Sequence, residues 1–193
     1  MKKLIPLFVF LFLVSGTSLV YSQNDSEGFK KWTEFMTPGT QHQMMASSVG
    51  TWNVSTTLWV YPGAQPMTST GTLVNEMLYG GRYLQGKVTS TSDRNSSPFE
   101  GMFITAYDNA TQTYQNMWID NGSTSIHNTS GTMSADGKTL TMTGTSTDLM
   151  TGQPSSVREV ITFNNANSTT WEFYKTLNET GKEFKMMQIE YTR

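Results

Sequence analysis

Residues 48–63, "SVGTWNVSTTLWVYPG", contain the point at which a polar segment changes into an alternating one. Side chains alternate between the two faces of a strand, so every second residue from Trp52 onward shares the face of that tryptophan. The residues between these inner positions begin with Asn53, Ser55 and Thr57, which are polar and favour water. This stretch therefore predicts a half-buried first strand with its largest side chain at its start. The residues expected on the inner face are Trp52, Val54, Thr56, Leu58 and Val60.

The period of two continues from Thr51 to the C-terminus. The alternating stretches are separated by short connections rich in Gly, Asn, Asp and Pro, so neighbouring strands should pair as antiparallel hairpins. A meander of this length normally closes on itself, because closure removes both exposed edges. The expected strands are 51–60, 69–79, 82–92, 99–107, 112–120, 123–130, 138–146, 155–163, 168–176 and 182–192.

The expected fold class is all-β, an antiparallel up-and-down barrel of the calycin or lipocalin kind, with about eight to ten strands and short N-terminal helices. An open or sandwiched sheet is the alternative. The spacing of apolar residues in 24–36 predicts one short amphipathic helix. A second helix should follow, with Thr37 as its N-cap and Pro38 at its first position.

The two ends of the barrel sequence should meet. In a closed meander the last strand lies antiparallel to the first, so the C-terminal Arg193 should arrive beside Trp52. A planar guanidinium stacks on an indole ring and can donate hydrogen bonds to nearby carbonyl groups. We therefore expect these two residues to form a structural clasp at one end of the barrel rather than a binding site.

The N-terminus has the pattern of an export signal. Lys2 and Lys3 precede an apolar run at 4–14, and Val20 and Ser22 suit a cleavage site after Ser22. The apolar run is shorter than the roughly 20 residues of a transmembrane helix, so we expect no membrane span in the mature chain. The expected organisation is a signal peptide at 1–22, a helical segment at 23–49 and the barrel at 50–193.

The composition excludes several classes of function. The formal net charge is −2 and cysteine is absent. Such a chain has no basic surface to neutralise nucleic-acid phosphates, and it has neither thiol catalysis nor a Cys-based metal site. No P-loop, Gly-x-Ser-x-Gly, Gly-x-Gly-x-x-Gly or His-Glu-x-x-His motif occurs. We expect no nucleic-acid partner, no metal and no cofactor, and the sequence assigns no catalytic residue.

Ionisable residues in the middle of expected strands are the first indication of a site. Arg158 and Glu159 are consecutive, so one of the two must point into the barrel. A buried charge is either paired or holds a ligand group, and an inward arginine would suit a carboxylate or phosphate head group. An internal Arg–Glu pair that completes the barrel interior is the alternative. The other residues of this kind are Glu76, Arg82, Glu172 and Lys185.

Aromatic residues and methionines would supply the rest of a pocket. The candidate site places Arg82 or Arg158 at the polar head of a small, partly apolar or amphipathic ligand. Tyr107, Met117 and Trp118 would then lie along the body of that ligand. The same side chains would equally suit a solid core, since a small barrel can be filled by its own side chains.

Two further functions stay open. The outer Thr- and Asn-rich strands could bind a protein or a glycan, which would make this a structural or interaction barrel of the cell envelope. An enzyme would need an ionisable group such as His42 or Asp120 beside a cleft at the barrel mouth. Isolated histidines and aspartates in turn sequences usually have structural roles, so an enzyme is the least favoured of these functions.

Short stretches spread over the chain resemble one bacterial family. The Gly50-Thr51-Trp52 element looks like that of the calycin superfamily, and the wider pattern resembles the domain of unknown function 1579 (DUF1579). The resemblance implies a calycin-like barrel, often exported to the periplasm or secreted, with no established activity. The stretches that carry it are "VGTW" at 49–52, "YPGAQP" at 61–66, "GGRYL" at 80–84, "FEGMFITAYD" at 99–108, "WIDNGST" at 118–124, "GKTLTMTG" at 137–144, "VREV" at 157–160 and "EYTR" at 190–193, with His42 before them.

Overall fold

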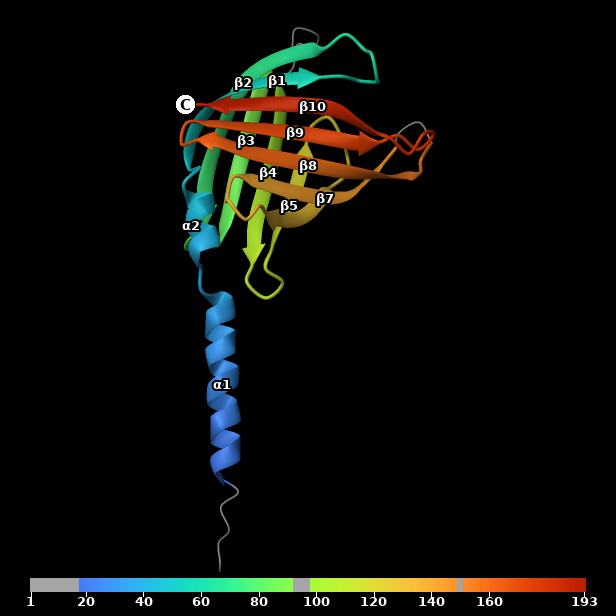
Figure 1. Cartoon of the computed structure of the whole chain (residues 1–193). Coiled ribbons are helices and arrows are strands. Elements are labelled where there is room, and N and C mark those ends of the chain that lie inside the picture. The colour runs from blue at the N-terminus through green and yellow to red at the C-terminus, as the bar shows by residue number, and fades with distance from the viewer. Residues whose placement is uncertain (1–17, 92–97, 149–150) are drawn as a thin grey trace, which may run out of the picture. The chain divides into compact units, whose positions relative to one another are not determined.

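The computed structural model describes residues 18–91, 98–148 and 151–193 (Figure 1). The apolar run at 4–14 that predicts a signal peptide lies outside the described residues. The chain divides into two compact units, Met1–Thr37 and Pro38–Arg193. The first contains helix α1 (Ser18–Met36), and the second contains helix α2 (Thr40–Ala46) and all the described strands. The strands are β1 (Gly50–Leu58), β2 (Met67–Leu78), β3 (Tyr83–Thr91), β4 (Phe99–Asp108), β5 (Thr113–Asp120), β6 (His127–Met133), β7 (Thr139–Thr147), β8 (Pro154–Asn165), β9 (Ser168–Thr176) and β10 (Glu183–Thr192).

In the part of helix α1 whose side chains the structure describes, the large apolar side chains are exposed. The helix includes the predicted helix at 24–36 and begins earlier, so it crosses the cleavage point expected after Ser22. In the described residues, no helix has both the length and the apolar character needed to cross a membrane. The exposed apolar side chains of α1 are Phe29, Trp32, Phe35 and Met36.

The strands form one closed antiparallel barrel, which confirms the predicted fold class. Each strand pairs with its neighbours in sequence, and β1 also pairs with β10, so the ten strands leave no free edge. Figure 1 shows β8, β9 and β10 crossing steeply in front of β3 and β4. Most predicted strand positions agree with the structure. The sixth strand is the main exception: it begins at His127 rather than near residue 123, because the turn after Asp120 extends further.

The inner face of β1 follows the predicted alternation. Trp52 and Val54 are buried, whereas Asn53 and Ser55 between them are exposed. The prediction for Val60 was wrong, because β1 ends at Leu58 and the valine lies beyond it with 52% of its surface exposed.

The barrel interior is packed at the end where α2 lies. Met45 of α2 joins side chains from β3, β5 and β7 in one buried cluster, and a second cluster surrounds Trp52. We call this the α2 end; the mouth is the opposite end, where β1, β3, β5, β7 and β9 finish. The first cluster contains Met45, Leu84, Tyr114, Leu140 and Met142. The second contains Trp52, Val54, Leu73 and Val88.

Arg193 lies over Trp52, with its guanidinium carbon 4.3 Å from the centre of the indole ring. The guanidinium also donates hydrogen bonds to the carbonyl oxygens of Val49 (3.0 Å), Ser47 (3.2 Å) and Ala166 (2.9 Å). The indole N–H in turn donates to the Ser48 carbonyl at 2.8 Å. These contacts join the C-terminus to the segment between α2 and β1 and to the turn between β8 and β9.

Glycines allow neighbouring strands to approach closely where the sheet bends. Gly131 on β6 faces inward, opposite Met142 on β7. A Cβ atom at this position would overlap the carbonyl oxygen of Thr141 and the Cα atom of Met142. Because these are backbone atoms of a paired strand, they cannot move aside on their own.

Replacing Gly131 by Ala should therefore destabilise the barrel by about 1–3 kcal/mol through overpacking. The melting temperature should fall by roughly 2–4 °C for each kcal/mol. Gly122→Ala is the matched control, since its Cβ would meet nothing closer than 3.4 Å. Thermal unfolding followed by circular dichroism measures both variants, and equal melting temperatures would contradict the constraint at Gly131.

Candidate functional site

A buried carboxyl group lies in the middle of the barrel. Glu159 of β8 points inward and is only 6% exposed. One carboxylate oxygen accepts a hydrogen bond from the Thr129 hydroxyl at 3.1 Å, and the other accepts one from the Trp171 indole N–H at 3.2 Å. Of the two consecutive charges on β8, it is therefore the glutamate that points inward.

The partners of Glu159 are neutral. Within the described ranges, no Lys, Arg or His forms an ion pair with this carboxylate. Burial raises the pKa of Glu159, and the hydrogen bonds from Trp171 and Thr129 oppose that rise. Burial also raises the pKa of Tyr191 on β10, with a further contribution from the charge of Glu159. The site thus combines an acidic group and a phenol in surroundings that disfavour their charged forms.

Apolar side chains of β9 and β10 surround this carboxyl group. The strand register places Phe173 opposite Glu159, and Met187 opposite Phe173. One row nearer the α2 end, Trp171 lies opposite Ile189. The rings of Trp171 and Phe173 stack at 5.7 Å between centres.

These inward-facing side chains are not fully buried. Trp171, Phe173, Met187 and Ile189 all keep part of their surface accessible, although they belong to a closed barrel. By contrast, Met142 in the packed cluster is 1% exposed. Because the outer surface of the sheet faces the other way, the remaining exposure points to space inside the barrel beside β9 and β10.

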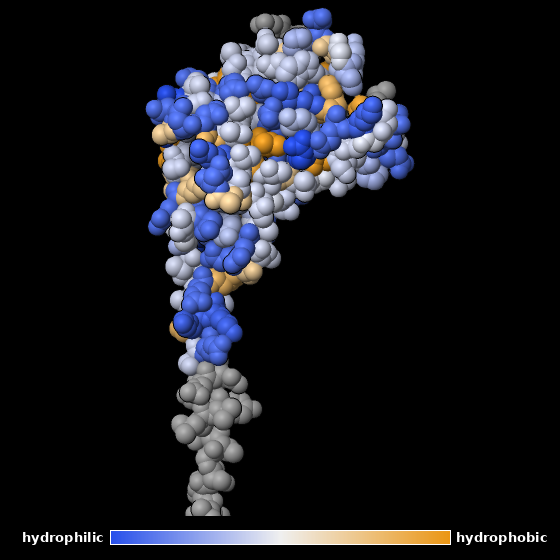
Figure 2. Space-filling model, in the orientation of Figure 1, coloured by the Kyte–Doolittle hydropathy of each residue, from blue (hydrophilic) through white to orange (hydrophobic). Residues whose placement is uncertain are grey.

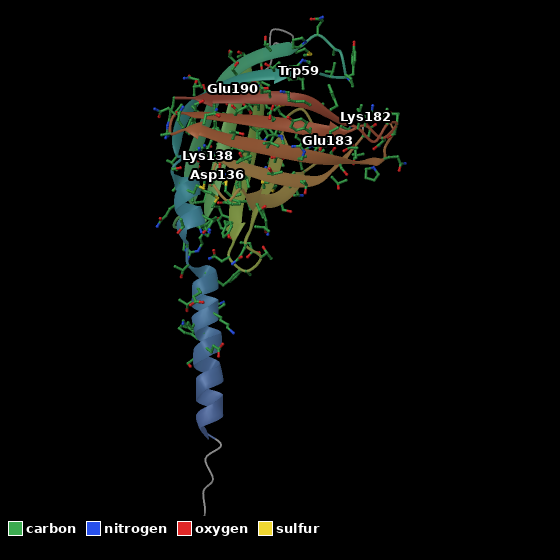
Figure 3. All side chains as sticks on the ribbon, viewed as in Figure 1. Trp59, Asp136, Lys138, Lys182, Glu183 and Glu190 are labelled. Atoms are coloured by element: carbon green, nitrogen blue, oxygen red, sulfur yellow. The ribbon has the colours of Figure 1, made fainter. Side chains whose placement is uncertain are left out.

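Arg158 does not reach this interior. It lies on the outer face, where its guanidinium makes two hydrogen bonds to the carboxylate of Glu183, at 2.8 and 2.6 Å, and stacks 4.1 Å above the ring of Tyr174. Figure 3 shows Glu183 at the end of the barrel where β9 and β10 connect. The prediction that Arg158 holds a ligand inside the barrel is therefore corrected: alternation along β8 turns it outward.

Two other predicted lining residues also lie outside the interior. Arg82 is exposed in the connection between β2 and β3 and donates a hydrogen bond to the Tyr79 carbonyl at 2.9 Å. Met117 is paired with Ile104, on the face opposite to that of its neighbour Trp118, so it lies on the outside. An apolar residue on β5 thus faces outward, which is why its hydrophobic character misled the sequence prediction.

Tyr107 and Trp118 do face inward, at opposite ends of the barrel. Tyr107 packs edge-on against Tyr114, 4.9 Å between ring centres, within the filled α2 end. Trp118 lies toward the mouth, stacked on Phe99 at 6.2 Å. Its indole N–H donates to Asp120 at 2.6 Å. Only Trp118 of the predicted lining residues therefore lies toward the mouth.

Sequence reasoning did not select Glu159, Thr129 and Tyr191 as a site. The signal that could have found Glu159 was the alternation within β8, which left open whether it or Arg158 points inward. Thr129 and Tyr191 carry no local signal, because only the pairing of β6 to β8 through β7 and of β10 to β9 brings them near.

The groups considered for catalysis are engaged in local structure. His42 is buried, and its Nδ1 accepts a hydrogen bond from the Gly39 N–H at 3.0 Å. Gly39, not Thr37 as predicted, is therefore the N-cap of α2. Asp120 accepts hydrogen bonds from Trp118 and from the Gly122 N–H, at the other end of the barrel from His42. In the part of the chain that the structure describes, no three His, Asp or Glu residues are grouped to hold a metal ion.

The outer surface of the barrel is polar and has one shallow groove of interest. Figure 2 shows hydrophilic and neutral residues over most of the visible face, with small hydrophobic areas between them. The groove has a volume of about 680 Å³ and follows β1, β2, β3 and the end of β10. Glu190, labelled in Figure 3, is its only carboxylate among the lining residues described. The groove is lined by Asn53, Val54, Ser55, Thr70, Gly71, Thr72, Thr89, Ser90, Thr91, Glu190 and Thr192.

These features define a ten-stranded lipocalin-like barrel that is packed at one end and carries a buried acid in its middle. The chain belongs to the family described as "Protein of unknown function (DUF1579)", which matches residues 37–193. The match begins just before α2 and covers the whole barrel, which confirms the resemblance seen in the sequence. No curated protein matches the chain.

Solved structures match the chain at low sequence identity. The S-type phycobiliprotein lyase CPES from Guillardia theta is 10% identical, with a TM-score of 0.56 over 80% of this chain and 93% of that one. The protein EF1p2_mFAP2b bound to DFHBI is 11% identical, with a TM-score of 0.41 over 80% of this chain and 99% of that one. At such identities the first likeness shows a common barrel fold and nothing more.

The buried acid should make stability depend on pH. Because the native pKa of Glu159 lies above its ordinary value of 4.5, its stability contribution is complete below pH 4.5 and is lost as pH rises through the native pKa. Glu159→Gln should therefore raise stability at pH 7 by about 1–3 kcal/mol, the usual penalty for an incompletely partnered buried polar group. It should have little effect at pH 4.

Denaturant unfolding at both pH values measures this difference. Glu172→Gln is the matched control, because Glu172 lies on the outer face and pairs with Lys185 at 2.9 Å. A Glu159→Gln variant that is less stable than the wild type at pH 7 would contradict the interpretation of an unpaired acid.

His42 should produce a second pH dependence of opposite sign. Burial lowers its native pKa below 6.5, so its contribution is complete above pH 6.5 and is lost as pH falls toward the native value. Glutamine at this position can accept the Gly39 hydrogen bond without titrating. We expect thermal unfolding of His42→Gln to show a smaller loss of stability than the wild type between pH 7.5 and 5.5; identical losses would contradict this role.

Proposed function

We propose that the barrel binds a small ligand with a largely apolar body, on the side formed by β8, β9 and β10. The observation that carries the proposal is the partial exposure of inward-facing apolar side chains beside a buried carboxyl group. Apolar walls with one or a few polar groups are the usual composition of small-molecule sites. Trp171, Phe173, Met187 and Ile189 would contact the body of the ligand, and Glu159 its polar end.

We also propose that the protein is exported, either to the periplasm or beyond it, with cleavage after Ser22. The support comes from the basic residues, apolar run and small residues of the N-terminus. A carrier outside the cytoplasm would meet its ligand without an uptake step. The ligand and the export are independent proposals, and one measurement can address both.

Native mass spectrometry of the protein purified from the exported fraction tests both proposals. The expected native mass includes an adduct that is lost on denaturation, and the denatured mass corresponds to a chain that begins at Gln23. An intact N-terminus would contradict cleavage.

Variants that fill the interior decide between a hollow and a solid barrel. Met187→Trp should abolish the adduct while leaving the melting temperature nearly unchanged if there is space beside β9 and β10, because Met187 faces inward and packs against neither buried cluster. Leu140→Trp is the matched control in the packed cluster, where overpacking should destabilise by about 1–3 kcal/mol. If Met187→Trp destabilises the protein as much as Leu140→Trp does, the interior is filled and the proposal is wrong.

The outer groove favours a second candidate, the binding of a polar ligand such as a glycan. Its hydroxyl and amide side chains offer many hydrogen-bonding groups over a volume of about 680 Å³. A ligand held there would persist in Met187→Trp, because that substitution lies on the inner face. The same mass spectra therefore separate the two candidates.

A further inference from the structure

Not every charged side chain in the described part of the barrel interior has a partner of opposite charge. Glu159 is held there by a hydroxyl and an indole N–H, and neither carries a charge. Lys175 shares the inward face of β9, but its ammonium group is bound to Asp148 at 2.6 Å. The charges of that pair cancel. Asp120 at the mouth also accepts hydrogen bonds only from neutral donors, but it is not buried, so Glu159 is the one buried carboxyl group without a charged partner among the described residues.

The geometry around Glu159 leaves room for further hydrogen bonds. A carboxylate has about four acceptor positions, and the described partners use two of them. The stacked rings of Trp171 and Phe173 lie on the adjacent strand, and both keep accessible surface. Aromatic faces attract cations through the negative potential above the ring, most strongly for tryptophan. A carboxylate beside accessible aromatic rings is therefore a site for an organic cation.

We infer that the ligand of this barrel carries a positively charged nitrogen group, such as an alkylammonium or amidinium, which pairs with Glu159 while its apolar body lies against β9 and β10. This inference rests on the proposed function and specifies the chemistry of the cargo. It reverses the expectation from sequence, in which an inward arginine would hold an anionic head group. Arg158 is engaged outside by Glu183, so the barrel interior does not supply that arginine.

An anionic ligand would face repulsion from Glu159, and a neutral one could donate a hydrogen bond but would leave the charge of the carboxylate uncompensated. A cation both neutralises the carboxylate and fills its vacant acceptor positions. The raised pKa of Glu159 agrees with this reasoning, because a group that lacks a charged partner gains most from acquiring one.

Three probes with the same tail test the inference: octylamine, octan-1-ol and octanoate. Isothermal titration calorimetry on the purified protein at pH 7 should give an affinity for octylamine about 10- to 100-fold above that for octan-1-ol, the range expected of one charge-assisted hydrogen bond. Octanoate should bind most weakly. In Glu159→Gln the preference for octylamine should disappear while the affinity for octan-1-ol is kept, and in the control Glu172→Gln it should persist.

A second measurement does not depend on a variant of the site. The affinity of the wild type for octylamine should fall as pH falls through the native pKa of Glu159, whereas that for octan-1-ol should not. The ionisable side chains that share the inner face of the described strands with Glu159 are Tyr191 on β10, Lys175 on β9, His127 on β6, Tyr114 and Asp120 on β5, and Tyr107 on β4. Repeating the series in His127→Gln is the control for the histidine, which lies two positions from Thr129.

The outcomes separate this inference from the proposed function. Equal binding of octylamine and octan-1-ol, or tighter binding of octanoate, would contradict the inference that the ligand is a cation. It would leave the proposal of a ligand-binding barrel intact. A preference that persists in Glu159→Gln would also contradict the inference of a cationic ligand. If none of the probes binds and Met187→Trp unfolds the protein, the barrel is filled and both proposals fail.

Discussion

The pairing of β1 with β10 is the constraint on which the rest of the structure depends. It closes the sheet, removes both free edges and thereby separates an inside from an outside. Arg193 strengthens this closure, because it stacks on Trp52 and donates hydrogen bonds to carbonyl groups of two separate connections. A tryptophan at the start of the first strand thus has a partner at the last residue of the chain.

Closure alone does not decide whether the interior is solid. Helix α2 inserts Met45 among Leu84, Tyr114 and Met142, and this fills one end. Among the described residues, β9 and β10 contribute no buried side chain to either cluster, although Ile189 and Tyr191 pack against the cluster around Trp52. This difference between the two halves of the barrel supports the proposed ligand-binding interior over a filled structural barrel.

The polarity of the interior follows from one-residue alternation. On the outer face, charges find partners: Arg158 pairs with Glu183, and Lys185 with Glu172. Exposed pairs of this kind contribute little to stability because water screens them. In the middle of the interior, the buried carboxyl group of Glu159 is held by neutral donors, and there the same screening is absent. The site therefore owes its character to a buried charge that lacks a charged partner.

Sequence alone determined the class of fold, because period-two alternation, turn residues and short connections are local signals that survive without tertiary context. It also placed Trp52 and Arg193 together, since closure of a meander allows only one arrangement of first and last strands. It could not decide between Arg158 and Glu159, because alternation gives two faces but not which one is buried. The face of β8 that is buried is set by the register of β8 with β7 and β9, which places Glu159 between Met142 and Phe173. The partial exposure of the inner faces of β9 and β10 likewise depends on how ten strands close and on which end α2 fills, and only the tertiary structure decides that.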